Sequence, residues 1–311
     1  MPITKAHIGV LMGGTSAERE ISLKTGKAIH AALKRCGYQA STIEVDASLP
    51  WILKRKKIDV AFLALHGPGG EDGTVQGMLD VLGIPYTGSG VRASAVGMDK
   101  SMTKALVERE GVPVAVGICL QKGEKVGPPK KLKWPLVVKP VNQGSTVGVS
   151  IVHTSAQWKT ALRRAWRQAS AVLAESYIDG REIAVSVLDG KALPTVEIVA
   201  PGGFYDFAAK YVKSETRYLC PAPLTKRQDR QVKEWAVRSY QALGCEGAAR
   251  VDFRINAKGR PFFLEINTIP GMTERSLLPM AAAQARISYE ALTERILQSA
   301  FKRKPLGLRK S

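Results

Sequence analysis

One stretch decides how this chain folds, Arg250-Val-Asp-Phe-Arg-Ile-Asn-Ala-Lys-Gly-Arg-Pro-Phe-Phe-Leu-Glu-Ile-Asn267. It contains two strand-like runs, 250–255 and 261–267, joined by the turn-forming residues of 256–260. Two apolar runs separated by a short polar segment that contains Asn and Gly are typical of a β-hairpin. The stretch therefore predicts two antiparallel strands.

The pairing of these strands determines which side chains share a face. We expect a register in which facing residue numbers sum to 517, so that Asp252 lies opposite Glu265 and Ile255 opposite Phe262. Side chains alternate between the two faces of a strand. The polar face then carries Arg250, Asp252, Glu265 and Asn267. The core face carries Val251, Phe253, Ile255, Phe262, Leu264 and Ile266.

The polar face of the hairpin is a candidate metal site. Two carboxylates that face each other destabilise a sheet unless a cation lies between them. Carboxylate and amide oxygens suit Mg²⁺, which keeps waters and bridges nucleotide phosphates, and Arg250 beside them suits a developing anion. The alternative is a solvated polar face with a shifted register, and the hairpin alone favours the two interpretations equally.

A second candidate site follows an apolar strand that ends at Lys139-Pro140. The next segment, Asn142-Gln-Gly-Ser-Thr-Val-Gly148, is rich in small residues whose backbone N–H groups and hydroxyls can surround a phosphate. No helix begins directly after it, so it is neither a P-loop nor a dinucleotide fingerprint. Taken alone, an ordinary hairpin turn is the better interpretation.

The first ninety residues predict a parallel sheet covered by helices. Apolar strands are expected at 7–12, 40–45 and 59–65, with a helix at 17–36. Thr15 and Glu18 fit a helix-capping box. Glu18 and His66 also fall at the carboxyl edge of the sheet, where ligands bind in such folds.

The rest of the chain predicts a mixed α+β region. Helices are expected at 98–111, 156–168, 226–243, 276–285 and 289–302. Strands are expected at 114–120, 135–139, 149–153, 171–177 and 182–188, before the hairpin. A long loop is expected at 201–223. A length of 311 residues is consistent with about two domains of ordinary size.

The composition excludes several classes of protein. The 46 Lys and Arg against 27 Asp and Glu give a net charge of +19. Such a charge attracts anions, but no nucleic-acid motif accompanies it, so we expect no nucleic-acid partner. The four cysteines are far apart, which argues against a zinc or redox motif. No apolar stretch fits a membrane span or a signal peptide, so we expect no membrane partner and a cytoplasmic protein.

Several motifs together resemble the D-alanine–D-alanine ligase family. They are Gly13-Gly-Thr-Ser-Ala-Glu-Arg-Glu20, Ala64-Leu-His-Gly67, Gly70-Glu-Asp-Gly73, Tyr86-Thr-Gly-Ser-Gly90, Met98-Asp-Lys100, Ala209-Lys-Tyr211 and Glu265-Ile-Asn-Thr-Ile-Pro-Gly-Met272. The resemblance extends over about residues 7–300. It implies an N-terminal parallel-sheet domain (1–95) followed by an ATP-grasp fold, whose two α+β domains (96–184 and 185–311) clamp ATP.

The resemblance also implies the activity and the residues that carry it. Family members use ATP and Mg²⁺ to join two D-alanines through an acylphosphate, for peptidoglycan precursors. The implied metal ligands, for two Mg²⁺ ions that Mn²⁺ could replace, are Asp252, Glu265 and Asn267. The implied ATP-binding residues are Lys100, Lys139, Ser145, Glu175, Ser176, Ile178, Glu182, Lys210 and Asn267.

The implied amino-acid site lies beside the nucleotide. The first D-alanine would be held by Glu18 and His66, with Ser145 and Tyr211 tying down a lid at 202–218. Ser276 would bind the carboxylate of the second D-alanine. Arg250 and the N–H of Gly271 would stabilise the tetrahedral intermediate. The resemblance also implies a homodimer.

Two alternatives remain at this point. One is a ligase with another acceptor, such as D-lactate or D-serine, although the pair Lys210-Tyr211 is what users of D-alanine carry. The other is a basic nucleic-acid binder on an inactive ligase scaffold, which the intact set of acidic and basic site residues argues against.

Overall fold

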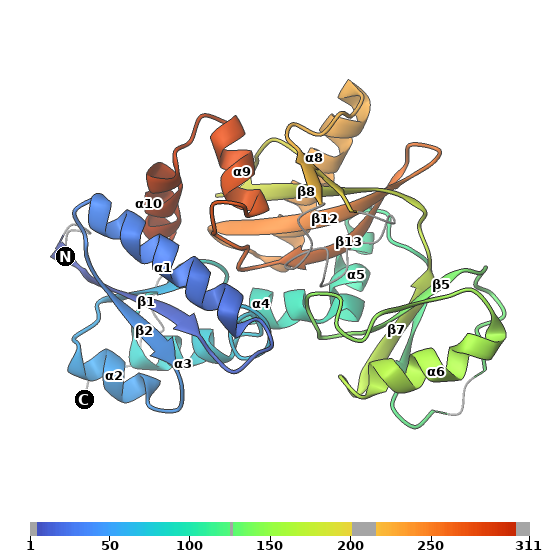
Figure 1. The fold of residues 1–311 in the computed structure, drawn as a ribbon, viewed down its shortest axis with the longest axis horizontal. Coiled ribbons are helices and arrows are strands. Elements are labelled where there is room, and N and C mark those ends of the chain that lie inside the picture. Colours follow the sequence, from blue (N-terminus) through green and yellow to red (C-terminus); the bar gives the residue numbers. More distant parts are fainter. Residues whose placement is uncertain (1–4, 125–126, 201–215, 303–311) are drawn as a thin grey trace.

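The computed structural model describes residues 5–124, 127–200 and 216–302, which form three sheets with covering helices (Figure 1). In Figure 1 the N-terminal sheet and the sheet that contains β5 and β7 lie on opposite sides of the molecule, and α4 and α5 lie between them. The sheet that contains β8, β12 and β13 lies above these two helices. This arrangement places the predicted hairpin near the centre of the molecule, between the N-terminal sheet and the sheet that contains β5 and β7.

The N-terminal sheet is parallel, as predicted, with the strand order β2-β1-β3. Its strands are β1 (His7–Gly13), β2 (Gln39–Val45) and β3 (Val60–Leu63). Its helices are α1 (Arg19–Arg35), α2 (Leu49–Arg55) and α3 (Thr74–Leu82), of which the last two were not predicted. All four residues of β3 are buried, as is typical of a parallel sheet that is covered on both faces.

The predicted capping box at Thr15 and Glu18 is wrong. Helix α1 begins at Arg19, and Glu18 is its N-cap residue without a side-chain cap. The Ser16 hydroxyl accepts the Glu18 backbone N–H at 3.2 Å and donates to the His66 carbonyl at 2.6 Å. Ser16 therefore fastens the loop, which leaves the Glu18 carboxylate available to point toward another part of the chain.

The second sheet is antiparallel, with the order β4-β7-β5-β6. Its elements are β4 (Gly117–Gln121), β5 (Leu136–Pro140), β6 (Ser150–Val152), β7 (Ala171–Ser176) and the helix α6 (Ser155–Trp166). Helix α6 packs Trp158, which is fully buried, into a core with Leu136 and Val138. The strand predicted from residue 114 begins only at Gly117.

The third sheet has the order β11-β10-β8-β12-β13, with β9 paired to β8. Its strands are β8 (Gly180–Leu188), β9 (Lys191–Ala192), β10 (Val196–Val199), β11 (Arg217–Leu219), β12 (Ala248–Asn256) and β13 (Pro261–Asn267). Its helices are α8 (Lys226–Leu243), α9 (Leu277–Gln284) and α10 (Tyr289–Ala300). The predicted domain boundary at residue 184 falls inside β8, and both boundaries stay predictions.

The helix predicted at 98–111 is α5 (Lys100–Arg109), and a separate helix that was not predicted, α4 (Val91–Met98), ends directly before it. The Asp99 carboxylate accepts the backbone N–H groups of Ser101 and Met102, each at 2.9 Å. An aspartate in this position satisfies the free donors of a helix start, so a new helix begins at once. The start of α5 fixes the direction in which Lys100 points.

The hairpin pairs as predicted at its polar end, where Asp252 lies opposite Glu265 and Arg250 opposite Asn267. The predicted pair of Ile255 and Phe262 is wrong, because a β-bulge after Asp252 shifts the register and Ile255 faces Pro261. Beyond the bulge Phe263 is buried in the core, in place of Phe262 and Leu264, which are only partly buried. The bulge thereby releases Leu264 from the core.

None of the helices in the described part of the chain is both long enough and apolar enough to cross a membrane.

Candidate active site

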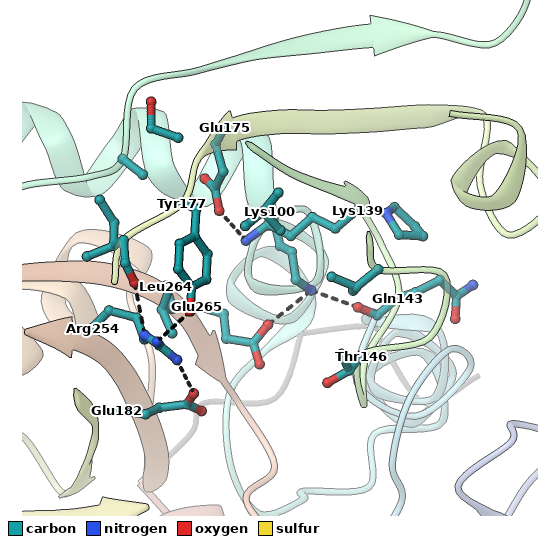
Figure 2. A pocket seen from close by; sticks show the side chains of 16 residues that line it. Lys100, Lys139, Gln143, Thr146, Glu175, Tyr177, Glu182, Arg254, Leu264 and Glu265 are labelled. Carbon is teal, nitrogen blue, oxygen red and sulfur yellow. Dashed lines mark hydrogen bonds and ion pairs between the residues drawn. The ribbon is translucent and has the colours of Figure 1, made fainter. Parts of the chain in front are cut away.

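A pocket lies between the second and third sheets and contains about 800 Å³ of empty space up to its open side (Figure 2). Its lining residues come from α5, from the segment before β4, from β5 and the loop after it, from β7 and the residues that follow it, and from β8, β12 and β13. They are Lys100, Ala115, Val137, Lys139, Pro140, Gln143, Thr146, Val149, Glu175, Ser176, Tyr177, Ile178, Glu182, Arg254, Leu264 and Glu265. Most of the residues predicted to bind ATP in the described chain therefore share one cavity.

The polar face of the hairpin forms one corner of the site. The Arg250 guanidinium donates to both oxygens of the Asp252 carboxylate, at 2.8 and 2.9 Å. The Asn267 amide donates to the same carboxylate at 3.2 Å. Among the described residues, no group of three or more His, Cys, Asp or Glu side chains is arranged to hold a metal ion, so the candidate donors at this corner are two carboxylates and one amide.

Lys100 connects the hairpin to the small-residue loop. Its ammonium lies 3.2 Å from a Glu265 carboxylate oxygen and donates to the Gln143 carbonyl at 2.7 Å, as Figure 2 shows. The side chain is nearly buried. A charged donor held between these two groups marks the place where an anion would meet the hairpin.

The small-residue loop has an unusual backbone. Ser145 and Thr146 have φ angles of 50° and 64°, a left-handed conformation that side chains other than Gly seldom adopt. Turns of this kind bring successive N–H groups onto one concave surface that binds anions. The Ser145 hydroxyl donates to the Glu18 carboxylate, which joins the loop to the start of α1.

A buried carboxylate organises the lysines of the pocket. Glu175 on β7 pairs through one oxygen with Lys139, at 2.6 Å, and through the other with Lys104. Although burial acts to raise it, the two ammonium groups hold the pKa of the Glu175 carboxyl below its usual range. Lys104 was not predicted as a site residue, and its position one turn after Lys100 was the available signal.

The far end of the pocket has an arginine that was also missed. Arg254 faces Glu182 across the β12–β8 pair, at 3.4 Å between side-chain atoms. It also donates to the Ile178 carbonyl at 3.2 Å and lies 5.6 Å from the centre of the Tyr177 ring. Arg254 follows Arg250 and Asp252 on the same face of β12, and this alternation could have revealed it.

The edge of the parallel sheet supplies an acidic end to the site. Glu18 lies so close to Gly67 and Gly144 that a Cβ at either glycine would come within 3.1 Å of its carboxylate. The Glu71 carboxylate accepts the Gly67 N–H at 2.7 Å. The motif that contains Glu71 was noticed in the sequence, but no role was assigned to that residue.

The ionisation of this acidic end follows from its burial. Burial, together with the nearby Glu18 and Glu265 carboxylates, raises the pKa of Glu71 to about 8. Burial also lowers the pKa of His66 below its usual range, against the influence of Glu18. At neutral pH both side chains are therefore mostly uncharged.

The remaining predicted residues divide into two groups. Gly271 approaches Ser276 so closely that a Cβ there would lie 2.9 Å from the Ser276 hydroxyl, and this hydroxyl accepts the Thr273 N–H at 3.0 Å. Lys210, Tyr211 and the predicted lid as far as residue 215 lie outside the described residues.

Comparisons with known proteins match this chain over nearly its whole length. A family model described as "D-ala D-ala ligase N-terminus" matches residues 7–58 and 52–89, and one described as "D-ala D-ala ligase C-terminus" matches residues 106–298. A D-alanine–D-alanine ligase of Syntrophotalea carbinolica is 49% identical over 302 residues, which cover 97% of this chain and 98% of the relative. A ligase of the same description from Geobacter sulfurreducens is 46% identical over 295 residues, with 94% and 93% covered.

Solved structures agree with these sequence matches. A D-alanine–D-alanine ligase from Bacillus anthracis, solved in complex with ATP, superimposes with a TM-score of 0.85 at 37% identity. The match covers 96% of this chain and 98% of that structure. A second structure of the ligase from this organism gives a TM-score of 0.86 at 40% identity. The fold implied by the resemblance to this family is thereby confirmed.

Proposed function

The chain belongs to the D-alanine–D-alanine ligase family and is an ATP-dependent ligase, and from this premise we propose how its residues divide the work of joining two D-alanines. The observation that carries the assignment is the convergence of the hairpin's polar face, the lysine-lined pocket and the acidic edge of the parallel sheet around one place. Each of these three parts suits one component of the reaction.

The pocket between the two sheets binds ATP in this proposal. Lys100 and Lys139 lie where the phosphates would be, beside the loop with left-handed residues. The backbone and side chains of Ser176 and Ile178, with Leu264, form the wall for the adenine, and Glu182 is placed for the ribose. Phosphoryl transfer depends on positioning and on neutralising charge rather than on a covalent enzyme group, and these lysines supply both.

The hairpin's polar face fits Mg²⁺. Asp252 and Glu265 face each other in register, and Asn267 lies beside Asp252 on the same side. These are the hard oxygen donors that Mg²⁺ prefers. We propose that Asp252, Glu265 and Asn267 hold the magnesium, which when bound neutralises phosphate charge. Arg250 pairs with Asp252 and Lys100 pairs with Glu265, so each of the two carboxylates also has a cationic neighbour.

The acidic edge of the parallel sheet receives the first D-alanine. Its ammonium pairs with Glu18, whose carboxylate the Ser145 hydroxyl holds in place, and the neutral His66 is close by. The substrate carboxylate then points toward the phosphate end of the pocket. Its oxygen attacks the γ-phosphorus of ATP, the bond from that phosphorus to the β-phosphate oxygen breaks, and an acylphosphate and ADP form.

The second D-alanine completes the reaction. Ser276 binds its carboxylate, and its uncharged amine attacks the acyl carbon to give a tetrahedral intermediate. The Arg250 guanidinium and the Gly271 N–H stabilise the negative oxygen of that intermediate. As this intermediate collapses, the bond from the acyl carbon to the phosphate oxygen breaks, the nitrogen gives up one proton to the departing phosphate, and D-alanyl-D-alanine remains. Without water, the acylphosphate cannot hydrolyse before this step.

The test is phosphate release with ATP, Mg²⁺ and D-alanine, with L-alanine and D-lactate as alternative substrates and product analysis by mass spectrometry. We expect D-alanine-dependent release and a dipeptide product. Release that is equally fast with D-lactate as acceptor, giving a depsipeptide, would contradict the proposed acceptor. Salt-dependent nucleic-acid binding without any such release would favour the inactive scaffold instead. The homodimer implied by the resemblance stays a prediction.

A further inference from the structure

Two lysines of helix α5 form ion pairs with two different sheets. Lys100 and Lys104 are four residues apart and so lie on one face of the helix. Lys100 pairs with Glu265 on β13 of the third sheet, and Lys104 pairs with Glu175 on β7 of the second sheet. Of these two lysines, only Lys100 lines the pocket, whereas Lys104 reaches it through its ion pair with Glu175.

The contact between Lys104 and Glu175 is enclosed. The side chains of Lys104, Glu175 and Lys139 are 7%, 3% and 9% exposed. Glu175 lies opposite Gly117 of β4 and Val137 of β5, and a Cβ on Gly117 would come within 2.9 Å of the Glu175 Cβ. Strand β4 therefore packs closely against the backbone and Cβ of Glu175. Each oxygen of the Glu175 carboxylate has one lysine partner.

The charge of this cluster depends on Lys104. With both lysines protonated, two positive charges share one negative charge, so one positive charge remains for a ligand. Without Lys104, Glu175 and Lys139 would neutralise each other, and the carboxylate would draw Lys139 away from the pocket. A buried pair interacts strongly because the surroundings screen it poorly.

We propose that Lys104 is a positioning residue, which competes for the Glu175 carboxylate and so leaves the charge of Lys139 available to the phosphates of ATP. This inference rests on the proposed function, in which Lys139 contacts those phosphates. Lys104 itself touches no substrate in this proposal and acts through Glu175.

The ionisation of Lys104 agrees with such a role. Burial lowers the pKa of its ammonium to about 8, with Lys139 acting in the same direction and Glu175 and Glu265 opposing it. These are the charged groups that influence it from β5, β7 and β13. As the pH rises through about 8, Lys104 loses its proton and the cluster loses its surplus positive charge.

The experiment measures the Kd of the full-length protein for a non-hydrolysable ATP analogue with Mg²⁺ by calorimetry, without D-alanine. Lys104→Met should raise this Kd about tenfold, whereas Lys104→Arg should restore most of the affinity. Arg109→Met, a change at an exposed cation on the same helix, is the matched control and should leave the Kd unchanged. Circular dichroism and thermal melting establish that each variant is folded.

Two further arms separate a positioning role from a structural one. In a Glu175→Gln background the added change Lys104→Met should have no further effect on the Kd, because Lys104 acts only through that carboxylate. In a pH series from about 7 to 9.5 the wild-type Kd should rise above pH 8, and in Lys104→Arg this rise should disappear, since an arginine keeps its charge.

The outcomes distinguish the proposed contact between Lys139 and the phosphates of ATP from the proposed role of Lys104. If Lys139→Met leaves the Kd unchanged, the proposed phosphate contact itself is wrong. If Lys139→Met weakens binding but Lys104→Met does not, only the role of Lys104 is overturned. An equal loss from Lys104→Met with and without Glu175 would also overturn it, because the effect would then not pass through that carboxylate.

Discussion

The two ends of the site have opposite electrical character. The end at the parallel sheet contains the carboxyl groups of Glu18 and Glu71 and a neutral His66. The end between the antiparallel sheets contains Lys100 and Lys139. An amino acid has an ammonium at one end and a carboxylate at the other, so we propose that this contrast orients it with the carboxylate toward the phosphates of ATP.

The two ends also differ in how their charges are balanced. At the lysine end Glu175 is enclosed and its two oxygens have fixed lysine partners. At the acidic end burial keeps Glu71 mostly protonated, so one negative charge remains where two carboxyl groups meet. In the proposed site, burial therefore limits the charge of the acidic end by protonating Glu71, whereas at the lysine end the buried charges are stabilised by ion pairs.

The largest effect is expected where the two ends meet, at the hairpin. Asp252→Ala or Glu265→Ala should lower turnover on the order of 10³-fold, because each removes an oxygen ligand for the magnesium that neutralises phosphate charge. Steady-state phosphate release at saturating ATP and D-alanine measures it. Glu234→Ala, at an exposed carboxylate on α8, is the matched control. Wild-type turnover in either hairpin variant would refute the metal assignment.

Variants of Glu18 and Lys139 test the two ends separately, because each should affect a different substrate. Glu18→Gln should raise the KM for D-alanine about 10²-fold and leave the affinity for ATP unchanged, because it removes the partner of the substrate ammonium. Lys139→Met should do the reverse. Separate titrations of the two substrates measure both effects. If each variant raised both constants equally, the division of the site into two ends would be wrong.

The pH dependence of the free energy of unfolding should reveal whether the Glu71 carboxyl is protonated in the folded chain. Its pKa is about 8 in the folded chain against an ordinary 4.5, so between these values only the folded state holds the proton. The free energy of unfolding should therefore fall as the pH rises through this window. Relative to Glu71→Gln, we expect a loss of about 2 kcal/mol by pH 8, allowing for partial exposure.

Urea unfolding of the metal-free protein across this pH range measures the loss. The Glu71→Gln variant stays neutral, so the difference between the two curves isolates this carboxyl from other titrating groups. Parallel curves for the two proteins would mean that Glu71 is ionised in the folded chain, and the acidic end would then carry two negative charges.

The smallest effect is expected at the apolar wall of the lysine end. Leu264→Ala should raise the KM for ATP about fivefold, since it removes apolar contact area in the pocket, and should leave the KM for D-alanine unchanged. Leu219→Ala, at an exposed leucine of β11, is the control. A fall in thermal stability without any change in either KM would show that Leu264 belongs to the core after all.

Local sequence patterns were sufficient to predict several strands and helices of this molecule. The alternation of Arg250 and Asp252 with buried Val251 and Phe253 predicted the polar face of the hairpin, since side-chain direction in a strand follows from position alone. The apolar runs of the first sixty-five residues likewise predicted a parallel sheet. Helix α8 was predicted with both of its boundaries, Lys226 and Leu243, and Gly244 marks its end. The structure adds a capping box at its start, formed by Thr225 and Gln228.

Other features depend on contacts between distant segments. The bulge at Leu264 cannot be read from the hairpin, because burial of Phe263 against the rest of the core determines it. The observed start of α1, at Arg19, differs from the predicted start at residue 17 for a similar reason. Ser16 is fastened to His66, fifty residues away, and no local capping rule includes that partner.

By itself, the amino-acid sequence determined most of the longer strands and helices, the carboxylates that face each other across the hairpin, and the family to which the motifs point. Only the tertiary structure decided the pairing of Lys104 with Glu175, the contact of Ser145 with Glu18, and the neutral state of Glu71. The physical reason is that periodicity and capping act over a few residues, whereas burial and ion pairing depend on segments that meet only when the sheets pack together.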